Sequence, residues 1–152
     1  MLTRSLAATV VLPGTVALLV PAFLWYSPLR LLIDLGVARW AGVALLGAGA
    51  LLYGWTTLDF ARRGHGTPAP WDPPQKLVVS GLYRFSRNPM YVGVLSWILG
   101  AGLLLQSAGL LGYAALVGIG FHLRVVLFEE PMLQKEFGQE FADYRRTVRR
   151  WI

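Results

Sequence analysis

The sequence has no cysteine and few charged residues of either sign. Without cysteine the chain can form no disulfide, no thiolate metal site and no cysteine nucleophile, so these three chemistries are excluded. Only 14% of its residues are charged, whereas 55% are hydrophobic, and the mean hydropathy is +0.52. Too few polar side chains remain to cover the surface of a water-soluble domain. The composition therefore predicts an integral membrane protein.

Four long apolar runs take up most of the chain, at residues 6–26, 37–58, 89–105 and 108–128. An α-helix satisfies its own backbone hydrogen bonds in lipid, and about 20 residues cross the hydrocarbon core. The third run is short, so we expect it to thin the bilayer or to lie partly inside the protein. Only Gln106 and Ser107 separate the last two runs, which predicts a helical hairpin. The expected fold is an all-α membrane bundle with about four transmembrane helices.

The lysines and arginines are distributed unequally across this arrangement. Twelve fall on one side of the membrane, and only Arg30 and Arg39 fall on the other. Because basic residues accumulate on the cytoplasmic side, a multi-pass protein with both termini and the connection 59–88 in the cytoplasm is predicted. The glycines and prolines of this connection predict an irregular loop. Since the basic residues flank apolar runs, the net charge of +6 favours lipid headgroups over nucleic acid.

The C-terminal region has helical periodicity. Five apolar residues recur at spacings of three and four: Phe137, Phe141, Tyr144, Val148 and Trp151. Four arginines share the opposite face: Arg145, Arg146, Arg149 and Arg150. The pattern predicts an amphipathic helix at the membrane interface. One domain, 1–152, is expected, comprising two spans (1–58), a cytoplasmic loop (59–88), a helical hairpin (89–130) and an amphipathic tail (131–152).

The stretch GLYRFSRNPMYVG, residues 81–93, places polar side chains against the start of an apolar run. Asn88 and Pro89 are typical of the N-cap and first position of a helix. A cap accounts for this pair without any ligand. It does not account for the gathering of Tyr83, Arg87 and Tyr91 at the same helix start. The free N–H groups of such a helix end suit a carboxylate or a phosphate.

A second polar stretch, LFEEPML, occupies residues 127–133 at the end of the fourth run. Adjacent carboxylates at a membrane edge are costly to desolvate, so cationic groups should lie near Glu129 and Glu130. One interpretation is structural pairing with Arg124 or Arg87. The other is that either glutamate binds a cationic cofactor, its hydroxyls or a substrate group.

These two stretches, the hairpin between them and the ending FGQEFADYRRTVRRW resemble the integral-membrane methyltransferases that include isoprenylcysteine carboxyl methyltransferase and phosphatidylethanolamine N-methyltransferase. The resemblance covers roughly residues 75–151. It implies an S-adenosylmethionine-dependent enzyme that methylates a lipid or lipidated acceptor at the cytoplasmic membrane face.

The resemblance also implies site residues. The isoprenylcysteine enzymes hold the cofactor through positions that match the following residues: Gln75, Lys76, Leu77, Val78, Tyr83, Asn88, Pro89, Met90 and Tyr91. The phospholipid enzymes use a Gly-x-Gly that matches Gly47 and Gly49, and a glutamate pair that matches Glu129 and Glu130. Small residues in an apolar run also let helices pack closely, which is the alternative interpretation of the two glycines.

The catalytic residues implied are Arg124, Glu129 and Glu130. In the isoprenylcysteine enzymes, an arginine before the acidic cluster and a glutamate within it contact the substrate, although this arginine aligns at Val125. Asn88 follows the phospholipid enzymes, whereas the C-terminal sequence follows the carboxyl methyltransferases. A carboxylate acceptor needs no general base, so alignment would dominate. An amine acceptor would need a carboxylate to take its proton. Carboxyl methylation leads, and phospholipid N-methylation is the alternative.

Two other interpretations remain open. Membrane sterol-type reductases, which use a nicotinamide cofactor, have a similar Arg-x-Pro-x-Tyr helix start, but their core needs more spans. A small helical scaffold could use the charged stretches only to anchor helix ends. His65 and His122 have no partners at metal-ligand spacing, so no metal site is predicted.

Overall fold

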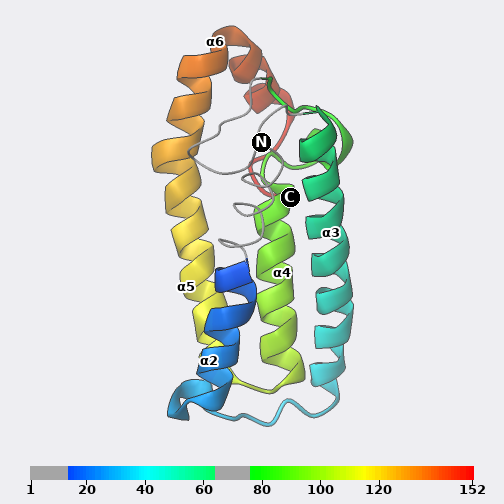
Figure 1. Ribbon diagram of the computed structural model, residues 1–152, viewed down its shortest axis with the longest axis vertical. Coiled ribbons are helices and arrows are strands. Elements are labelled where there is room, and N and C mark those ends of the chain that lie inside the picture. The colour runs from blue at the N-terminus through cyan, green and yellow to red at the C-terminus, as the bar shows by residue number, and fades with distance from the viewer. Residues whose placement is uncertain (1–13, 64–75) are drawn as a thin grey trace.

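The computed structural model describes residues 14–63 and 76–152, and every regular element in these two stretches is helical (Figure 1). The longer helices are α2 (Val20–Tyr26), α3 (Ala41–Arg63), α4 (Pro89–Leu104), α5 (Ala108–Arg124) and α6 (Glu130–Thr147). Short 3-10 and π-helical turns join or extend them: η1 (Thr15–Leu19), η2 (Pro28–Arg30), η3 (Gly36–Trp40), η4 (Gly81–Arg84) and η5 (Val125–Glu129). The all-helical prediction is confirmed for the described residues.

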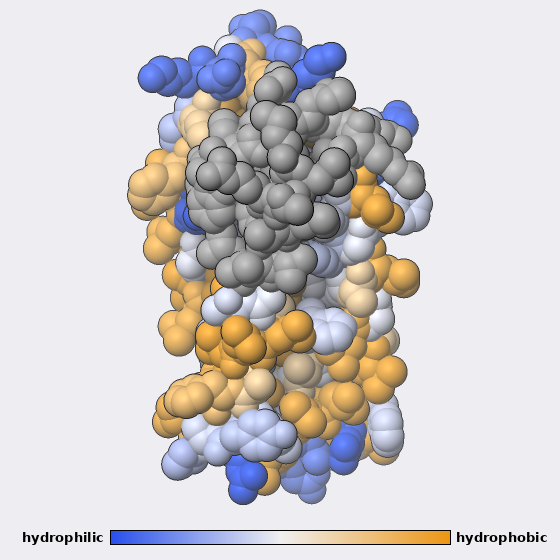
Figure 2. All heavy atoms as spheres, viewed as in Figure 1, coloured by the Kyte–Doolittle hydropathy of each residue, from blue (hydrophilic) through white to orange (hydrophobic). Residues whose placement is uncertain are grey.

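The surface is divided into an apolar middle and two polar ends. Figure 2 shows hydrophobic side chains in a band between hydrophilic ones. By length and composition, Gly36–Asp59 and Ala108–Thr147 can each cross a membrane, and Thr15–Tyr26 and Pro89–Leu104 are apolar but shorter. The number of helices that span the bilayer therefore stays a prediction. Residues 6–13 of the first expected span lie outside the described residues.

Glycines allow α3 and α4 to pack closely. A Cβ atom on Gly42 would lie 2.5 Å from the carbonyl oxygen of Gly100, and one on Gly49 would lie 2.7 Å from that of Gly93. The two glycines of each helix are seven residues apart, so they lie on the same face two turns from each other. Backbone approaches of this kind are available only to residues without a side chain. This contact fixes the position of α4, whose first turn carries the polar stretch.

The turn between α4 and α5 is anchored by Ser107, which is fully buried. Its hydroxyl accepts a hydrogen bond from the Leu110 amide at 3.2 Å and donates to the carbonyl of Arg30. Ser107 therefore caps α5 and also ties the turn to the chain after α2. The same end is joined by a hydrogen bond of 2.9 Å from the Ile33 amide to the carbonyl of Gln106.

Replacing Ser107 with alanine should remove both bonds and leave the Arg30 carbonyl without this donor. We expect a loss of about 1–2 kcal/mol in the free energy of unfolding. Thermal melting of the detergent-purified protein measures the effect. Ser96→Ala, in the middle of α4, is the matched control, because alanine suits a helix interior. Equal melting temperatures for the two variants would contradict the capping role.

The C-terminal region differs from the expected amphipathic helix. The helix from Ala108 runs without a break into α6, but the non-helical backbone of Gly138 (φ 51°, ψ −119°) kinks α6 and separates a second helical segment that ends at Thr147. Phe141 and Tyr144, expected to face lipid, are buried in the protein with 1% and 9% of their surfaces exposed. Val148 is extended, so residues 148–152 do not continue the helical face. The glycine at 138 allows the bend because its backbone has a positive φ.

A second difference concerns the connection 59–88. Helix α3 continues through Arg63, and η4 forms a helical turn at Gly81–Arg84. The predicted boundary followed the end of the apolar run, but a helix can extend beyond the lipid into polar sequence. At this boundary the indole N–H of Trp55 donates to Oδ2 of Asp59 at 3.1 Å, one turn further along α3.

Candidate functional site

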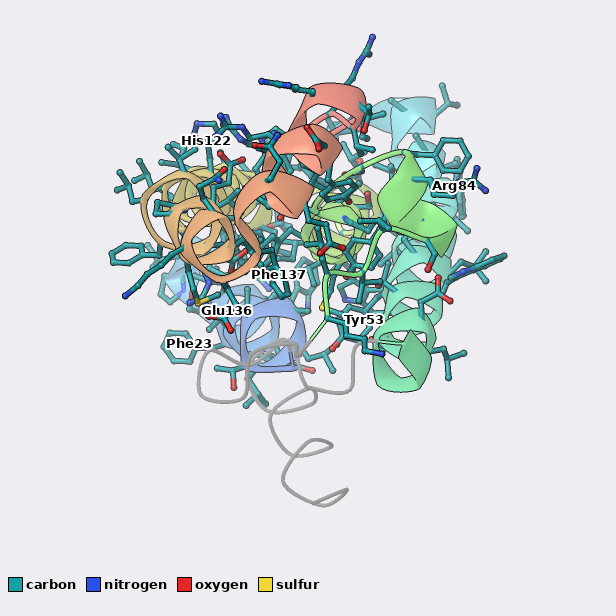
Figure 3. All side chains as sticks on the ribbon, turned by 90° about the horizontal axis from the view of Figure 1, so that it is seen from above. Phe23, Tyr53, Arg84, His122, Glu136 and Phe137 are labelled. Atoms are coloured by element: carbon teal, nitrogen blue, oxygen red, sulfur yellow. The ribbon has the colours of Figure 1, made fainter. Side chains whose placement is uncertain are left out.

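The polar residues singled out in the sequence meet at one end of the bundle. This end is formed by η4, the first turn of α4, η5, the start of α6 and the C-terminal residues 148–152. Figure 3 looks onto this end, with α5 and α6 on one side, α3 on the other and α4 between them. Arg84 points outward from η4 in this view and is exposed. The candidate site therefore combines segments that are more than 60 residues apart in the chain.

The first cluster joins Tyr91, Arg124 and Glu129. The hydroxyl of Tyr91 donates to Oε1 of Glu129, and Nε of Arg124 donates to the same oxygen at 2.8 Å. Arg124 also donates to the Tyr91 hydroxyl at 3.0 Å. The side chains of Arg124 and Glu129 keep 42% and 23% of their surfaces exposed. The cluster thus offers both charge signs to a ligand.

A π-helical turn brings Arg124 and Glu129 together. The two residues are five positions apart, and in a regular α-helix that spacing separates side chains by about 140°. In η5 the amide of Glu130 bonds back to the carbonyl of Val125, five residues earlier, so residues at this spacing share a face. Pro131 follows directly and has no amide hydrogen to continue an α-helical pattern. The sequence EEP is therefore a local signal for this turn.

The second cluster joins Glu130 to Arg87 and Arg150. Nε and Nη2 of Arg150 donate to Oε1 and Oε2 of Glu130 at 2.6 and 3.0 Å, a two-pronged contact. Nη1 of Arg87 lies 3.0 Å from Oε1, close enough for an ion pair but not aligned for a hydrogen bond. The side chains of Glu130 and Arg87 are each only 10% exposed. This cluster is closed, whereas the first is open.

The environment of Arg87 has an electrostatic consequence. Burial lowers the pKa of its guanidinium, and the charge of Glu130 opposes that shift. Within the described residues, Nε of Arg87 is buried without a hydrogen-bond acceptor. Buried donors normally have partners, so this N–H is available to an anionic or carbonyl group of a ligand.

Asn88 occupies the N-cap position of α4, and Pro89 takes the first helical position, as predicted. The Asn88 side chain does not cap the helix. Its amide instead donates to the carbonyl of Arg150 at 3.0 Å. Asn88 therefore leaves the N–H groups of the first turn of α4, which carry partial positive charge, without the side-chain cap usual at this position.

Tyr83 supports this end from below the surface. Burial raises its pKa well above the ordinary range of a tyrosine, and nearby groups, Tyr144 first and then Asp59, add to the shift. Its carbonyl accepts a hydrogen bond of 2.6 Å from the Tyr144 hydroxyl. Gly81 has φ +63°, and a Cβ there would lie 1.9 Å from Oδ2 of Asp59. Only glycine lets η4 lie this close to α3.

The remaining residues expected at the cofactor lie in different environments. Gln75 lies outside the described residues, Lys76 is exposed, and Leu77 and Met90 are half-buried. Val78 is buried with Tyr83. Gly49 lies in the contact between α3 and α4, while Gly47 is exposed and has no atom within 4 Å of a Cβ position. The two glycines thus face different directions, and Gly47 is not brought to either charged cluster.

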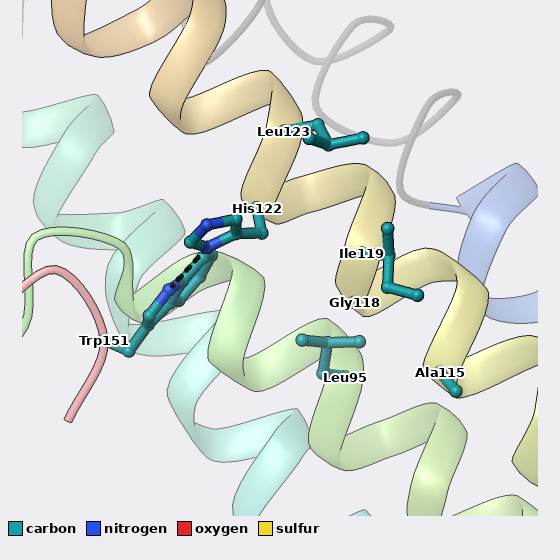
Figure 4. Close-up of a pocket in the computed structure, with 7 residues that line it drawn as sticks. All are labelled: Leu95, Ala115, Gly118, Ile119, His122, Leu123 and Trp151. Atoms are coloured by element: carbon teal, nitrogen blue, oxygen red, sulfur yellow. Dashed lines mark hydrogen bonds between the residues drawn. The ribbon is translucent and has the colours of Figure 1, made fainter.

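Two residues at this end of the bundle lie in other surroundings than the sequence predicts. Arg150 was expected to face lipid headgroups, but it turns inward because the helix ends before it. Trp151 was placed on an apolar helix face, but its indole N–H donates to Nδ1 of His122 at 3.3 Å (Figure 4). Trp151 and His122 border a groove of about 420 Å³ that is otherwise lined by residues of α4 and α5 (Figure 4). The adjacent carboxylates Glu129 and Glu130, which need cationic partners, were the feature of the sequence that could have pointed to Arg150.

The bundle and its two charged clusters define a membrane protein with a small, polar site at one end. The sequence profile of the phospholipid methyltransferase family matches residues 37–140. The chain therefore belongs to this family of methyltransferases, and the resemblance inferred from its motifs is confirmed.

Several curated proteins are similar to the chain. The cobalt-zinc-cadmium resistance protein CzcN of Cupriavidus metallidurans is 34% identical over 82% of the chain and 49% of its own length. The protein-S-isoprenylcysteine O-methyltransferase of Tribolium castaneum is 33% identical over 47% of the chain and 26% of its own length. That of Schizosaccharomyces pombe is 35% identical over 47% and 30%. The chain thus matches half or less of the length of each of these relatives. No solved structure matches.

Proposed function

We propose that this protein transfers a methyl group from S-adenosylmethionine to a lipid or lipidated acceptor, and that the acceptor group is a carboxylate, as in isoprenylcysteine carboxyl methylation. The observation that carries the proposal is the open cluster of Tyr91, Arg124 and Glu129 beside the uncapped start of α4. Family membership supplies the reaction class.

The available groups fit the cofactor. S-adenosylmethionine supplies an electrophilic methyl group on a positively charged sulfur, and its amino-acid end carries both charge signs. The first turn of α4 and the Nε–H of Arg87, which has no acceptor among the described residues, can receive the carboxylate. Glu129 can bind the ammonium or the ribose hydroxyls, and the ring of Tyr91 can pack against a cationic or aromatic group. Lys76, Leu77 and Val78, which precede η4, are proposed to take part in cofactor binding because they match the isoprenylcysteine enzymes. Gln75 is proposed on the same match and lies outside the described residues.

The charge balance at the two glutamates supports a carboxylate acceptor. Oε1 of Glu129 already accepts hydrogen bonds from Tyr91 and Arg124, and both carboxylate oxygens of Glu130 accept from Arg150, so these oxygens are less available to take a proton from an acceptor. An ammonium acceptor needs a base, whereas a carboxylate can attack the methyl carbon directly. Arg124 can orient the acceptor carboxylate, because its side chain is 42% exposed, against 33% for Arg150. Phospholipid N-methylation remains the second candidate because Asn88 matches the phospholipid enzymes.

The site end is proposed to face the cytoplasm. Most of the lysines and arginines belong to this end, which the excess of positive charge assigns to the inner leaflet. We propose that the apolar helices, including the shorter α2 and α4, form a multi-pass bundle with both termini on that side. An acceptor held in the bilayer by its hydrocarbon chain could then reach the site without leaving the membrane.

The test begins with cofactor binding. Isothermal calorimetry of the detergent-purified protein should detect S-adenosylhomocysteine and give no signal with NADPH. Radiolabelled S-adenosylmethionine should then transfer its methyl group to an S-farnesylcysteine derivative, and not to phosphatidylethanolamine in mixed micelles.

Each other outcome has a meaning. Absence of S-adenosylhomocysteine binding would overturn the methyltransferase proposal, and NADPH binding alone would favour a reductase. Failure to bind either ligand would favour the scaffold interpretation. Methylation of phosphatidylethanolamine alone would keep the enzyme class and replace the acceptor.

A further inference from the structure

We infer that the C-terminal residues 148–152 form a clasp over the site, and that Arg150 is a positioning residue that acts through Glu130. The two adjacent glutamates then have separate tasks: Glu129 faces the ligand, and Glu130 holds the clasp. This inference rests on the proposed function for the identity of the ligand. The clasp itself rests on contacts between described residues.

The clasp joins the start of α4 to the start of α6. The amide of Arg87 donates to the carbonyl of Arg149 at 2.9 Å, and Ser86 and Arg149 form an isolated parallel bridge. The side chain of Asn88 donates to the carbonyl of Arg150 at 3.0 Å. The guanidinium of Arg150 then reaches Glu130 with two hydrogen bonds. Backbone and side-chain contacts of one short segment thus hold both polar stretches of the sequence.

The contacts of Glu130 leave it little capacity for a ligand. One oxygen already faces two guanidinium groups, and the other accepts from Nη2 of Arg150. Its side chain is 10% exposed, against 23% for Glu129. Consecutive residues on a helix point about 100° apart, so one carboxylate can face the site while the next faces the clasp. A cationic ligand would have to displace Arg150 to reach Glu130, but it can reach Glu129 without doing so.

Truncating the Arg150 side chain should therefore weaken ligand binding, although Arg150 itself does not contact the ligand. Removing this side chain leaves Arg87 as the one ion-pair partner of Glu130 among the described residues, and it loosens the segment that holds the Asn88 side chain. We expect Arg150→Ala to raise the Kd for S-adenosylhomocysteine about tenfold. Arg150→Lys keeps the charge but cannot make the two-pronged contact, so it should recover part of the affinity. Arg149→Ala is the matched control, because its side chain is exposed and its backbone carbonyl remains.

A double-mutant cycle shows whether Arg150 acts through Glu130. If it does, Arg150→Ala combined with Glu130→Gln should raise the Kd no further than the stronger single variant, and the shifts in melting temperature should likewise fail to add. The fitted number of binding sites should stay constant, because a merely unfolded fraction lowers that number and leaves the Kd unchanged.

The inference is overturned alone if the wild-type protein binds S-adenosylhomocysteine and Arg150→Ala binds it equally well, or if the two substitutions act independently in either measurement. If the wild-type protein binds none, the proposed function fails, and the positioning role fails with it. Lack of coupling between the melting temperatures would remove the clasp whatever the ligand is.

Discussion

Replacing Gly49 with leucine is expected to prevent α3 and α4 from packing. A Cβ atom at this position would lie 2.7 Å from the carbonyl oxygen of Gly93 and 2.7 Å from the amide nitrogen of Trp97. Both atoms belong to the backbone of α4, so no side-chain rotation can make room. The helices must separate, and we expect a loss of at least about 3 kcal/mol in the free energy of unfolding. Thermal melting should show a fall of about 10 °C or more.

Gly47→Leu provides a control only two residues away. This position has no atom within 4 Å of a Cβ and is exposed on the outer face of α3, where leucine suits lipid. We expect an unchanged melting temperature and unchanged binding of S-adenosylhomocysteine. Lost binding without lost stability at Gly47 would support the cofactor role that the Gly-x-Gly pattern suggests. Equal melting of the two variants would contradict the packing role of Gly49.

Much of the fold could be predicted because it depends on short-range patterns. Apolar runs of helical length gave the helices, and the Asn88–Pro89 pair gave the start of α4. The end of α3 was placed too early because the apolar run ends before the helix does. The C-terminal face was misjudged for a similar reason: periodicity identifies an apolar face but not what covers it. Phe141 packs against protein, which requires the long-range arrangement of the bundle.

The site was only partly accessible from sequence. The acidic pair and its need for cations were visible, and Arg124 and Arg87 were named as candidate partners, which the structure bears out as contacts. Arg150 was not named, because a continuous helix would have carried its side chain toward headgroups. The π-helical turn that aligns Arg124 with Glu129 was also missed, although Pro131 marks it. Both features depend on where a helix departs from regular geometry.

Replacing Glu129 with glutamine is expected to reduce methyl transfer about 100-fold in kcat/KM, since hydrogen bonds to charged groups contribute about 1.5–3 kcal/mol. Glutamine keeps the size of the side chain and can still accept from Tyr91. It removes the negative charge that balances Arg124 and that would bind a cationic ligand. Transfer of radiolabelled methyl groups to the S-farnesylcysteine derivative measures the loss.

Glu136→Gln is the matched control for this substitution. Glu136 lies two turns further along the same helical run, is exposed and is labelled in Figure 3. The same loss of one negative charge there should leave turnover within about twofold of the wild-type value, since substitutions on the surface, away from buried side chains and ion-pair networks, have small effects. If Glu129→Gln retained full turnover while Glu130→Gln lost it, the two glutamates would have exchanged roles. The two variants separate ligand contact from positioning. The loss at Glu130, whose side chain is 10% exposed and holds Arg150, should fall on cofactor affinity and stability together. The loss at Glu129, whose partner Arg124 is 42% exposed and can be solvated, should fall on turnover and lower the melting temperature less than the loss at Glu130.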